Sequence, residues 1–295
     1  MDRLDSAILK VLLVNNGVPP GVKVLRKSFR SMAKELKVDQ ATVRARMKRF
    51  QANQVLKGWA LGVSPGTRGQ HVGQVWLGVK ESEKAGVTRA LLSMSEVERV
   101  CSYFGPFLSF VFLFDGGADP KPITEHLLRK LQPRVAVLRE GMIPVPRLEL
   151  KDTDASIVRS LESDPWKSYQ RVAHEVRTSS RTVARRVAKM SEQGAIYMLP
   201  VVDLKALGGV IPAELVVEYS SSKSKGTANQ QIARHIGHDL VFSDVSGPHG
   251  YFALLVENLS QLERIAEWSK KVEGVRGARV GALQDVVLGQ KYYKN

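Results

Sequence analysis

The sequence predicts an α+β protein with an internal duplication: a helix-turn-helix domain, then a βαββαβ domain, and then the same pair again. Three observations lead to this prediction. A short amphipathic helix rich in arginine is expected at residues 39–50 and again at 179–190. A constant offset of 140 residues relates the segments that follow in the two halves, and helices and strands are expected in the same order in both. A repeat near half the chain length indicates duplication of a whole unit.

The helix at 39–50 is defined by one apolar stripe. Val43, Met47 and Phe50 are spaced i, i+4, i+7, the spacing of one helical face. Asp39 precedes the helix, and its carboxylate is expected to accept a hydrogen bond from a free N–H group of the first turn. The basic side chains of this helix lie off the stripe: Arg44, Arg46, Lys48 and Arg49. A helix that packs by one stripe and carries cations elsewhere suits a DNA groove, whereas a single such helix is also typical of an ordinary surface helix.

The first 62 residues predict a helix-turn-helix domain. Residues 4–14 have helical spacing, with Asp2 or Asp5 near the start, and Asn15-Asn16-Gly17 ends that helix. Ser28 or Ser31 is expected to begin a second short helix, which a tight turn joins to the helix at 39–50. Residues 55–61 are strand-like. Three short helices, the last two joined by a tight turn, form the helix-turn-helix pattern.

The next segment predicts a ferredoxin-like domain. Residues 63–71 are expected to form a linker. The elements that follow are a strand at 72–79, a helix at 82–94, a hairpin of strands at 97–104 and 107–114 around Gly105-Pro106, a helix at 120–131 and strand structure at 135–146. The order βαββαβ is that of the ferredoxin-like sandwich.

The pattern restarts after residue 147. Asp154, Ile157 and Leu161 resemble the opening helix, and Gly105-Pro106 returns as Gly247-Pro248 after a small insertion near 221–228. The second βαββαβ set is expected at 213–219, 226–236, 239–246, 250–256, 259–271 and 276–288. The predicted domains are therefore 1–62, 63–147, 148–199 and 200–295.

The charge distribution indicates a polyanionic partner. The chain has 295 residues, a net charge of +15 and a pI near 9.9, which favours nucleic acid first and an anionic membrane surface second. Residues 1–62 hold 13 Lys and Arg against 4 Asp and Glu, a net charge of +9, whereas residues 148–197 hold 9 against 7, a net charge of +2. The excess is concentrated in the first helix-turn-helix domain, which indicates a binding face there.

The remaining composition favours a cytoplasmic, nucleoid-associated protein. The lone cysteine, Cys101, lies in an alternating apolar run and is expected to be a buried thiol, as suits a reducing compartment. Charged residues from position 2 onward argue against a signal peptide. No apolar run approaches the roughly 20 residues that span a bilayer, so no membrane partner is expected.

Short motifs in both halves are similar to one known family. The first half contains Leu4-Asp5-x-x-Ile8-Leu9 and Ser31-x-Ala33-x-x-Leu36-x-Val38-x-x-x-Thr42-Val43-x-x-Arg46, and the second contains Asp154-x-x-Ile157-Val158, Val172-Ala173-x-x-Val176, Thr182-Val183-x-x-Arg186 and Gly194-Ala195-Ile196. Each half resembles the leucine-responsive/AsnC (feast/famine) transcription regulators of prokaryotes, including archaea. The resemblance implies a DNA-binding domain followed by a sensor domain that dimerises through its sheet. Two copies in one chain then imply an intramolecular pseudo-dimer that binds double-stranded DNA, and the charge difference implies a non-palindromic site.

The resemblance implies which side chains contact DNA. The recognition helices 39–50 and 179–190 would enter the major groove, with N-terminal residues nearest the base edges. The candidate DNA-binding residues are Lys27, Arg30, Gln40, Thr42, Arg44, Arg46, Arg49, Ser180, Arg181, Thr182, Arg185, Arg186 and Lys189. Arg46 and Arg186 match in both halves, so a structural or phosphate-binding role is open for them.

The resemblance also places a small-molecule effector near the turn between the second and third strands of a sensor domain. The residues there are Tyr103, Gly105, Phe107, Gly247, His249 and Tyr251. Amino-acid-binding members commonly have an acidic residue after the glycine, and both halves have proline at that place. A different ligand, or none, is therefore as good an expectation as an amino acid.

Other functions stay open beside the regulator. Siroheme decarboxylases share this domain plan, and His235, His238 and His249 are the histidines that an enzyme of that kind could use. A metal pair at His235-x-x-His238 has no clear third ligand, no cofactor is expected, and no catalytic motif stands out, so a non-enzymatic protein is favoured. An architectural protein that coats DNA without reading its sequence, and a protein-interaction module, are the further alternatives.

Overall fold

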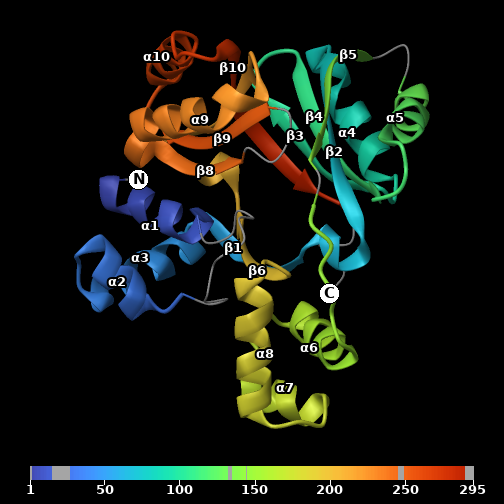
Figure 1. Ribbon diagram of the computed structural model, residues 1–295. Coiled ribbons are helices and arrows are strands. Elements are labelled where there is room, and N and C mark those ends of the chain that lie inside the picture. The colour runs from blue at the N-terminus through green and yellow to red at the C-terminus, as the bar shows by residue number, and fades with distance from the viewer. Residues whose placement is uncertain (1, 15–26, 132–134, 144, 245–248, 290–295) are drawn as a thin grey trace. The chain divides into compact units, whose positions relative to one another are not determined.

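The computed structural model describes residues 2–14, 27–131, 135–143, 145–244 and 249–289 (Figure 1). The elements gather into two compact units. One holds residues up to 69 together with 146–206, and the other holds residues 70–145 together with 207–294. The first unit contains both helix-turn-helix domains and the second contains both βαββαβ domains. The α+β fold class predicted from the sequence is therefore confirmed.

The first helix-turn-helix domain consists of α1 (Arg3–Val14), α2 (Phe29–Leu36) and α3 (Gln40–Ala52). Val43, Met47 and Phe50 are buried, as the stripe predicts. Full burial of one such side chain contributes roughly 2 kcal/mol to stability. Ser28 begins α2, and its hydroxyl accepts a hydrogen bond from the backbone N–H of Ser31. Asp39 begins α3, but its side chain makes no capping hydrogen bond, so the expected contribution of its carboxylate is wrong.

The second helix-turn-helix domain repeats this arrangement with α6 (Asp152–Ser163), α7 (Tyr169–Glu175) and α8 (Ser180–Glu192). Its core contains Val183, Val187 and Met190, 140 positions after the stripe of α3. The turn before α3 and the turn before α8 have the same unusual backbone: Lys37 and Arg177 both adopt a left-handed conformation with φ of 53°. This conformation is uncommon outside glycine and asparagine, so its recurrence at matched positions shows that the two turns share one geometry.

A two-stranded antiparallel ladder joins the two helix-turn-helix domains. It pairs β1 (Leu56–Val63) with β6 (Ile196–Val202) in register from Gly58–Val201 to Val63–Ile196. Leu61 of β1 is buried in the core of the second domain. Trp59 of β1 lies edge-on to Trp166, with ring centroids 5.5 Å apart. Each strand therefore belongs to the packing of both domains, which makes the pair one unit.

The second unit is built on an eight-stranded sheet with the order β5-β2-β4-β3-β10-β7-β9-β8. The strands of the first half are β2 (Gln70–Val79), β3 (Val97–Tyr103), β4 (Phe107–Asp115) and β5 (Val135–Ile143). Those of the second half are β7 (Ile211–Tyr219), β8 (Leu240–Asp244), β9 (His249–Val256) and β10 (Val275–Leu288). β10 joins the halves, because residues 275–282 pair with β7 and residues 283–288 pair with β3.

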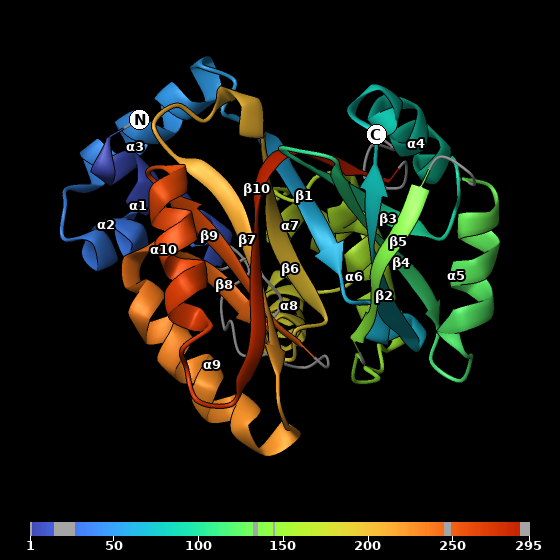
Figure 2. The same cartoon turned by 90° about the horizontal axis from the view of Figure 1, so that it is seen from above.

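Two helices cover the outer face of each half-sheet (Figure 2). These are α4 (Lys84–Leu92) and α5 (Pro120–Arg129) in the first half, and α9 (Ser222–Ile236) and α10 (Leu259–Ser269) in the second. Val87, Leu91 and Leu127 pack on the first half-sheet, and Ile232 and Leu262 pack on the second. Each half therefore has the predicted βαββαβ order with its own apolar core.

One expectation about a connecting segment is wrong. The predicted linker at 63–71 is mostly ordered structure: β1 continues to Val63, residues 65–68 form a 3-10 turn, and β2 begins at Gln70. The small insertion expected near 221–228 falls in the first turns of α9, which begins after a cap by the Ser221 hydroxyl and has 15 residues against the 9 of α4. Both segments contain glycine, proline or serine, which favour turns in a sequence but also occur at the starts of helices. Within the described residues, no helix is long and apolar enough to cross a membrane.

Candidate nucleic-acid interface

The exposed face of α3 is built by the same helix that fills the core. Gln40 and Arg44 are exposed, and Thr42 is half-buried between them. The Arg44 side chain has no partner among the residues that the structure describes. Arg30 on α2 is also exposed. This face therefore presents uncommitted donors to solvent, as binding to phosphates and base edges requires.

Arg46 and Arg49 have a different environment, because both contact the first helix of the domain. Arg46 Nη1 lies 2.9 Å from Asp5 Oδ1 and also contacts Asp2, and Arg49 Nη2 contacts Asp5 Oδ2. Asp5 is completely buried, whereas Arg49 is 47% exposed. A hydrogen bond from the Asp5 backbone and the Arg46 guanidinium hold the pKa of Asp2 below its usual value. Two of the predicted DNA-binding arginines therefore fasten α3 to α1.

Lys27 also has a structural partner. Its ammonium group forms an ion pair with Glu35 of α2. The equivalent residues in the second domain, Lys167 and Glu175, form the same pair at 2.8 Å. The offset of 140 residues is kept, so the pair belongs to the repeated framework rather than to the exposed basic face.

Helix α8 repeats the exposed face with different residues. Ser180, Arg181, Arg185 and Lys189 are exposed, and the three cations follow one another at four-residue spacing along one side of α8. Thr182 is occupied in capping: its backbone N–H donates to Ser179 Oγ at 3.1 Å, and its own hydroxyl accepts from Ser179 Oγ at 2.9 Å.

Arg186 repeats the role of Arg46. Its Nη1 lies 2.9 Å from Asp154 Oδ1, the same distance as in the Arg46–Asp5 pair. Lys151 stands where the first domain has Asp2, so Arg186 contacts one carboxylate where Arg46 contacts two. The two domains therefore share one arginine–aspartate ion pair, but only the first domain has a second carboxylate beside the arginine.

Two of the predicted effector residues lie on strands of the sheet unit beside one buried carboxylate. Tyr103 at the end of β3 and Tyr251 on β9 both donate hydroxyl hydrogen bonds to the carboxylate of Glu214 on β7. Glu214 is 4% exposed, and sequence reasoning missed it. Its position as a charged residue within the strand at 211–219 is the sequence signal that could have identified it. Burial, and then the negative charge of Glu214, raise the pKa of both tyrosines above the ordinary value.

The other predicted effector residues are not gathered at Glu214 by any contact. Gly105 forms the β3–β4 turn with φ of 88°, and Phe107 is 46% exposed beside it. His249 lies near Gly141 of β5, where an added methyl group would be 4.0 Å from the imidazole ring. Gly247 lies outside the described residues.

The remaining sequence candidates have no catalytic arrangement around them. His235 stacks on Trp268 with ring centroids 3.7 Å apart, and His238 is exposed next to Asp239. Among the described residues, no group of three or more His, Cys, Asp or Glu side chains could hold a metal ion. Cys101 is a buried free thiol, as the alternating pattern predicts.

No protein-family model matches the chain. The sequence is similar to two uncharacterised HTH-type transcriptional regulators. It is 30% identical over 152 residues to one from Pyrococcus horikoshii, which covers 49% of this chain and 94% of the relative. It is 27% identical over 144 residues to one from Pyrococcus abyssi, which covers 48% of this chain and 89% of the relative. Each relative therefore corresponds to about half of the chain.

Two solved structures are similar to the chain over different lengths. The siroheme decarboxylase NirDL, solved with an iron-uroporphyrin III analogue, matches 98% of this chain and 93% of its own with a TM-score of 0.52 and 12% identity. AsnC of E. coli matches 47% of this chain and 94% of its own with a TM-score of 0.35 and 15% identity. At these identities the likeness to NirDL concerns the fold alone.

Proposed function

Because the chain belongs to the HTH-type transcriptional regulators, we propose that it is a sequence-specific regulator that binds double-stranded DNA as an intramolecular pseudo-dimer. In this proposal α3 and α8 are the recognition helices, and each enters a major groove. The observation that carries the proposal is the exposed basic face on each of the two helices, on domains that a shared β ladder joins. The concentration of charge in residues 1–62 supports it.

Within this proposal the basic residues have two separate tasks. Gln40 and Arg44 on α3, and Ser180, Arg181 and Arg185 on α8, read bases or bind phosphates, because their side chains are exposed. Arg30, Thr42, Lys189 and the exposed part of Arg49 bind the DNA backbone. Arg46, Arg186 and Lys27 support the domain, since ion pairs with acidic residues occupy them.

The two recognition helices read different sequences in this proposal. The exposed positions 40, 41 and 44 hold Gln, Ala and Arg, whereas the matched positions 180, 181 and 184 hold Ser, Arg and Ala. Arginine favours guanine and glutamine favours adenine in the major groove. The preferred operator is therefore an asymmetric site with two unlike halves. Descent from an internal duplication explains both the shared framework and the different contact residues.

The sheet unit has the part of the sensor in this proposal. It holds the two halves together through β10, and its open strands β5 and β8 are the edges through which further copies would assemble. Any effector is a small molecule near Tyr103 and Tyr251, because both tyrosines face a buried carboxylate.

Binding to a selected duplex and to unrelated duplexes at several salt concentrations tests the proposal. We expect selection from random sequences to yield one asymmetric site, with affinity at least about 1,000-fold above that for unrelated duplexes. A steep salt dependence with no sequence preference would instead support an architectural DNA-coating protein. Absence of binding at low salt would refute both.

The fold likeness to siroheme decarboxylase along nearly the whole chain favours a second candidate, an enzyme on the same domain plan. His249, which lies near Gly141 of the first half-sheet, is the histidine that such an enzyme could use. A tetrapyrrole absorbance band in the purified protein, or saturable binding of an iron porphyrin, would support this candidate. Its absence together with selective DNA binding would leave the regulator.

A further inference from the structure

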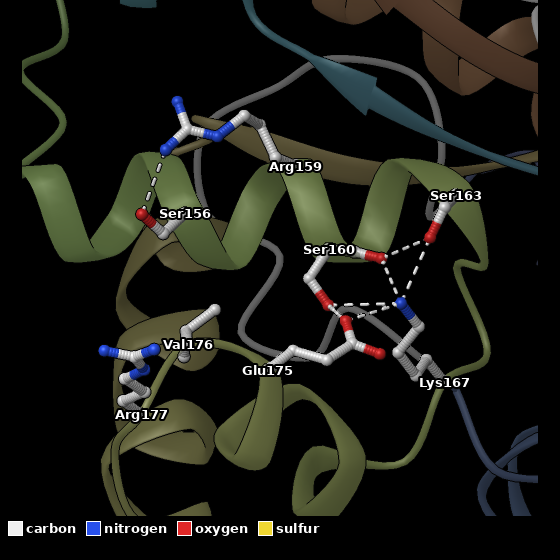
Figure 3. A pocket seen from close by; sticks show the side chains of 8 residues that line it. All are labelled: Ser156, Arg159, Ser160, Ser163, Lys167, Glu175, Val176 and Arg177. Atoms are coloured by element: carbon white, nitrogen blue, oxygen red, sulfur yellow. Dashed lines mark hydrogen bonds and ion pairs between the residues drawn. The ribbon is translucent and has the colours of Figure 1, made fainter.

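A polar pocket of about 530 Å³ lies in the second helix-turn-helix domain, outside the proposed recognition face (Figure 3). It is formed between α6 and the end of α7. Its lining consists of Ser156, Arg159, Ser160, Ser163, Lys167, Glu175, Val176 and Arg177. Three of these residues are cations and one is an anion, so the lining has a formal charge of +2. The proposed DNA contacts on α8 do not use it.

An ion pair between buried Lys167 and Glu175, whose side chain is 34% exposed, occupies one end of the pocket. Lys167 is 7% exposed, and its Nζ lies 2.8 Å from Glu175 Oε2, 2.9 Å from the Ser160 carbonyl and 3.1 Å from Ser163 Oγ. Hydrogen bonds from Lys167 and then Ser160 lower the pKa of Glu175, which keeps it ionised. The Lys167 and Glu175 charges therefore cancel, and the excess charge of the lining belongs to the two arginines.

The two arginines are exposed and retain donors for a ligand. Arg159 gives one hydrogen bond, from Nη2 to Ser156 Oγ at 3.0 Å, which orients its guanidinium over α6. The Arg177 side chain has no partner within the described part of the chain, and its backbone is held in the left-handed conformation. In Figure 3 both guanidinium groups lie toward the end of the pocket away from Lys167, with Arg159 at α6 and Arg177 beside Val176 just after α7. Guanidinium groups bind phosphate oxygens through paired charge-assisted hydrogen bonds.

The first domain retains the charges of this pocket but lacks its hydroxyl groups. The ion pair returns as Lys27 with Glu35, and Lys37 takes the place of Arg177 with the same φ. Helix α1 matches α6 at an offset of 149, so Lys10 takes the place of Arg159. The three serines are replaced by Ala7, Val11 and Val14. The matched site of the first domain is therefore an internal control for the pocket.

We infer that this pocket binds a phosphate group, held between Arg159 of α6 and Arg177 just after α7. The group belongs either to a small phosphorylated molecule or to the DNA backbone, since the chemistry of recognition is the same. The inference goes beyond the proposed function, because it concerns a site outside the recognition helices and stands if no sequence is read.

The test uses the full chain and inorganic phosphate as the probe. Calorimetric titration of the wild type is expected to show saturable binding at one site. The double variant Arg159→Gln/Arg177→Asn removes both donors, and asparagine tolerates the left-handed backbone at 177. We expect affinity to fall at least about ten-fold in this variant. The control Lys10→Gln/Lys37→Asn makes the matched changes in the first domain and is expected to bind phosphate as the wild type does.

A second arm identifies the source of the phosphate. If phosphate binds equally well to the free protein and to the protein with duplex bound, the ligand is a small molecule. If duplex displaces phosphate and the double variant has a shallower salt dependence of duplex binding, the pocket takes a backbone phosphate. The inference is overturned if phosphate does not bind saturably and the salt dependence is unchanged, or if the control loses binding equally. Neither reading needs sequence-specific DNA binding, so failure of the proposed function is a distinguishable result.

Discussion

Asp5 and Arg46 are joined by an ion pair of 2.9 Å that connects α1 to α3, and Asp154 and Arg186 repeat the pair between α6 and α8 at the same distance. In both domains the aspartate also accepts a hydrogen bond from the backbone N–H three residues earlier. In each domain one carboxylate therefore caps the first helix and also holds the third helix against it. This arrangement explains why the matched arginines are shared by the two halves, whereas exposed residues around them differ.

The change Asp5→Asn is expected to destabilise the first domain by about 2 kcal/mol. Asp5 is completely buried and accepts from two guanidinium groups and one backbone N–H, and hydrogen bonds to charged groups contribute about that much. The free energy of unfolding from urea titration measures the effect. Asp39→Asn is the control: Asp39 is exposed and makes no capping bond, so its replacement should stay within about 0.5 kcal/mol. Equal effects of the two changes would contradict the assigned role of Asp5.

Arg44→Ala is expected to change DNA affinity, whereas Arg46→Ala is expected to change stability. Arg44 is exposed and without a partner in the described residues, so its loss should weaken binding to the selected duplex about ten-fold and leave the unfolding midpoint unchanged. Arg46 holds Asp5, so its loss should lower the unfolding midpoint. Affinities measured well below that midpoint should stay close to wild type. The role assigned to Arg46 is wrong if its replacement reduces affinity as much as that of Arg44 in a fully folded protein.

The fold was largely predictable from the sequence because periodicity and repetition agreed. Val43, Met47 and Phe50 could be placed in a core from spacing alone, and their matched residues in the second half strengthened that assignment. Side-chain partners were not predictable. Arg44 and Arg46 are equivalent in the sequence pattern. Arg46 has a structural role because α1 packs beside α3 and brings Asp5 to it.

The sheet unit shows the same limit. Glu214 could be seen as an acidic residue in a strand, but its hydrogen bonds to Tyr103 and Tyr251 depend on strands from both halves. Pairing between β3 and β10 is a contact over a long sequence distance, and local patterns carry no information about it. The pocket at Lys167 was missed for a related reason: its serines are separated from Arg177 by a loop and a helix.

Transplanting the exposed face of α3 onto α8 is expected to convert the operator preference. The changes Ser180→Gln, Arg181→Ala and Ala184→Arg give α8 the residues that α3 carries at the matched positions. If the two helices read unlike half-sites, selection with this variant should yield a site with two similar halves. The control Ala188→Lys adds a cation of α3 further along the helix, and should raise affinity for all duplexes without changing the selected sequence. An unchanged asymmetric site would show that α8 does not read bases.

The change Tyr103→Phe is expected to destabilise the sheet unit by about 1 kcal/mol. The Tyr103 hydroxyl is buried and is shared between Glu214 and Ser109, so its removal leaves a buried carboxylate with one donor fewer. Tyr219→Phe in the same unit is the comparison, because the Tyr219 hydroxyl donates to the neutral side chain of Asn229 at 3.1 Å and not to a carboxylate. Thermal unfolding followed in the near ultraviolet measures both changes. The Glu214 network has no energetic role if the Tyr103 variant unfolds at the temperature of the wild type.

Alkaline pH is expected to destabilise the sheet unit. Burial raises the pKa of the Cys101 thiol from 9.0 to about 12, and burial with the charge of Glu214 raises the pKa of Tyr103 and Tyr251. These groups keep their protons in the folded state, whereas the unfolded chain releases them near pH 9 to 10. The unfolded state then binds fewer protons, so stability is complete below pH 9 and falls as the pH rises above it. Cys101 alone should contribute a loss of about 1.4 kcal/mol per pH unit between pH 9 and pH 12. Urea titrations from pH 8 to pH 11 measure the slope, and Cys101→Ala should make it shallower from pH 9 onward. A wild-type slope that Cys101→Ala leaves unchanged would mean that the thiol is not buried in solution.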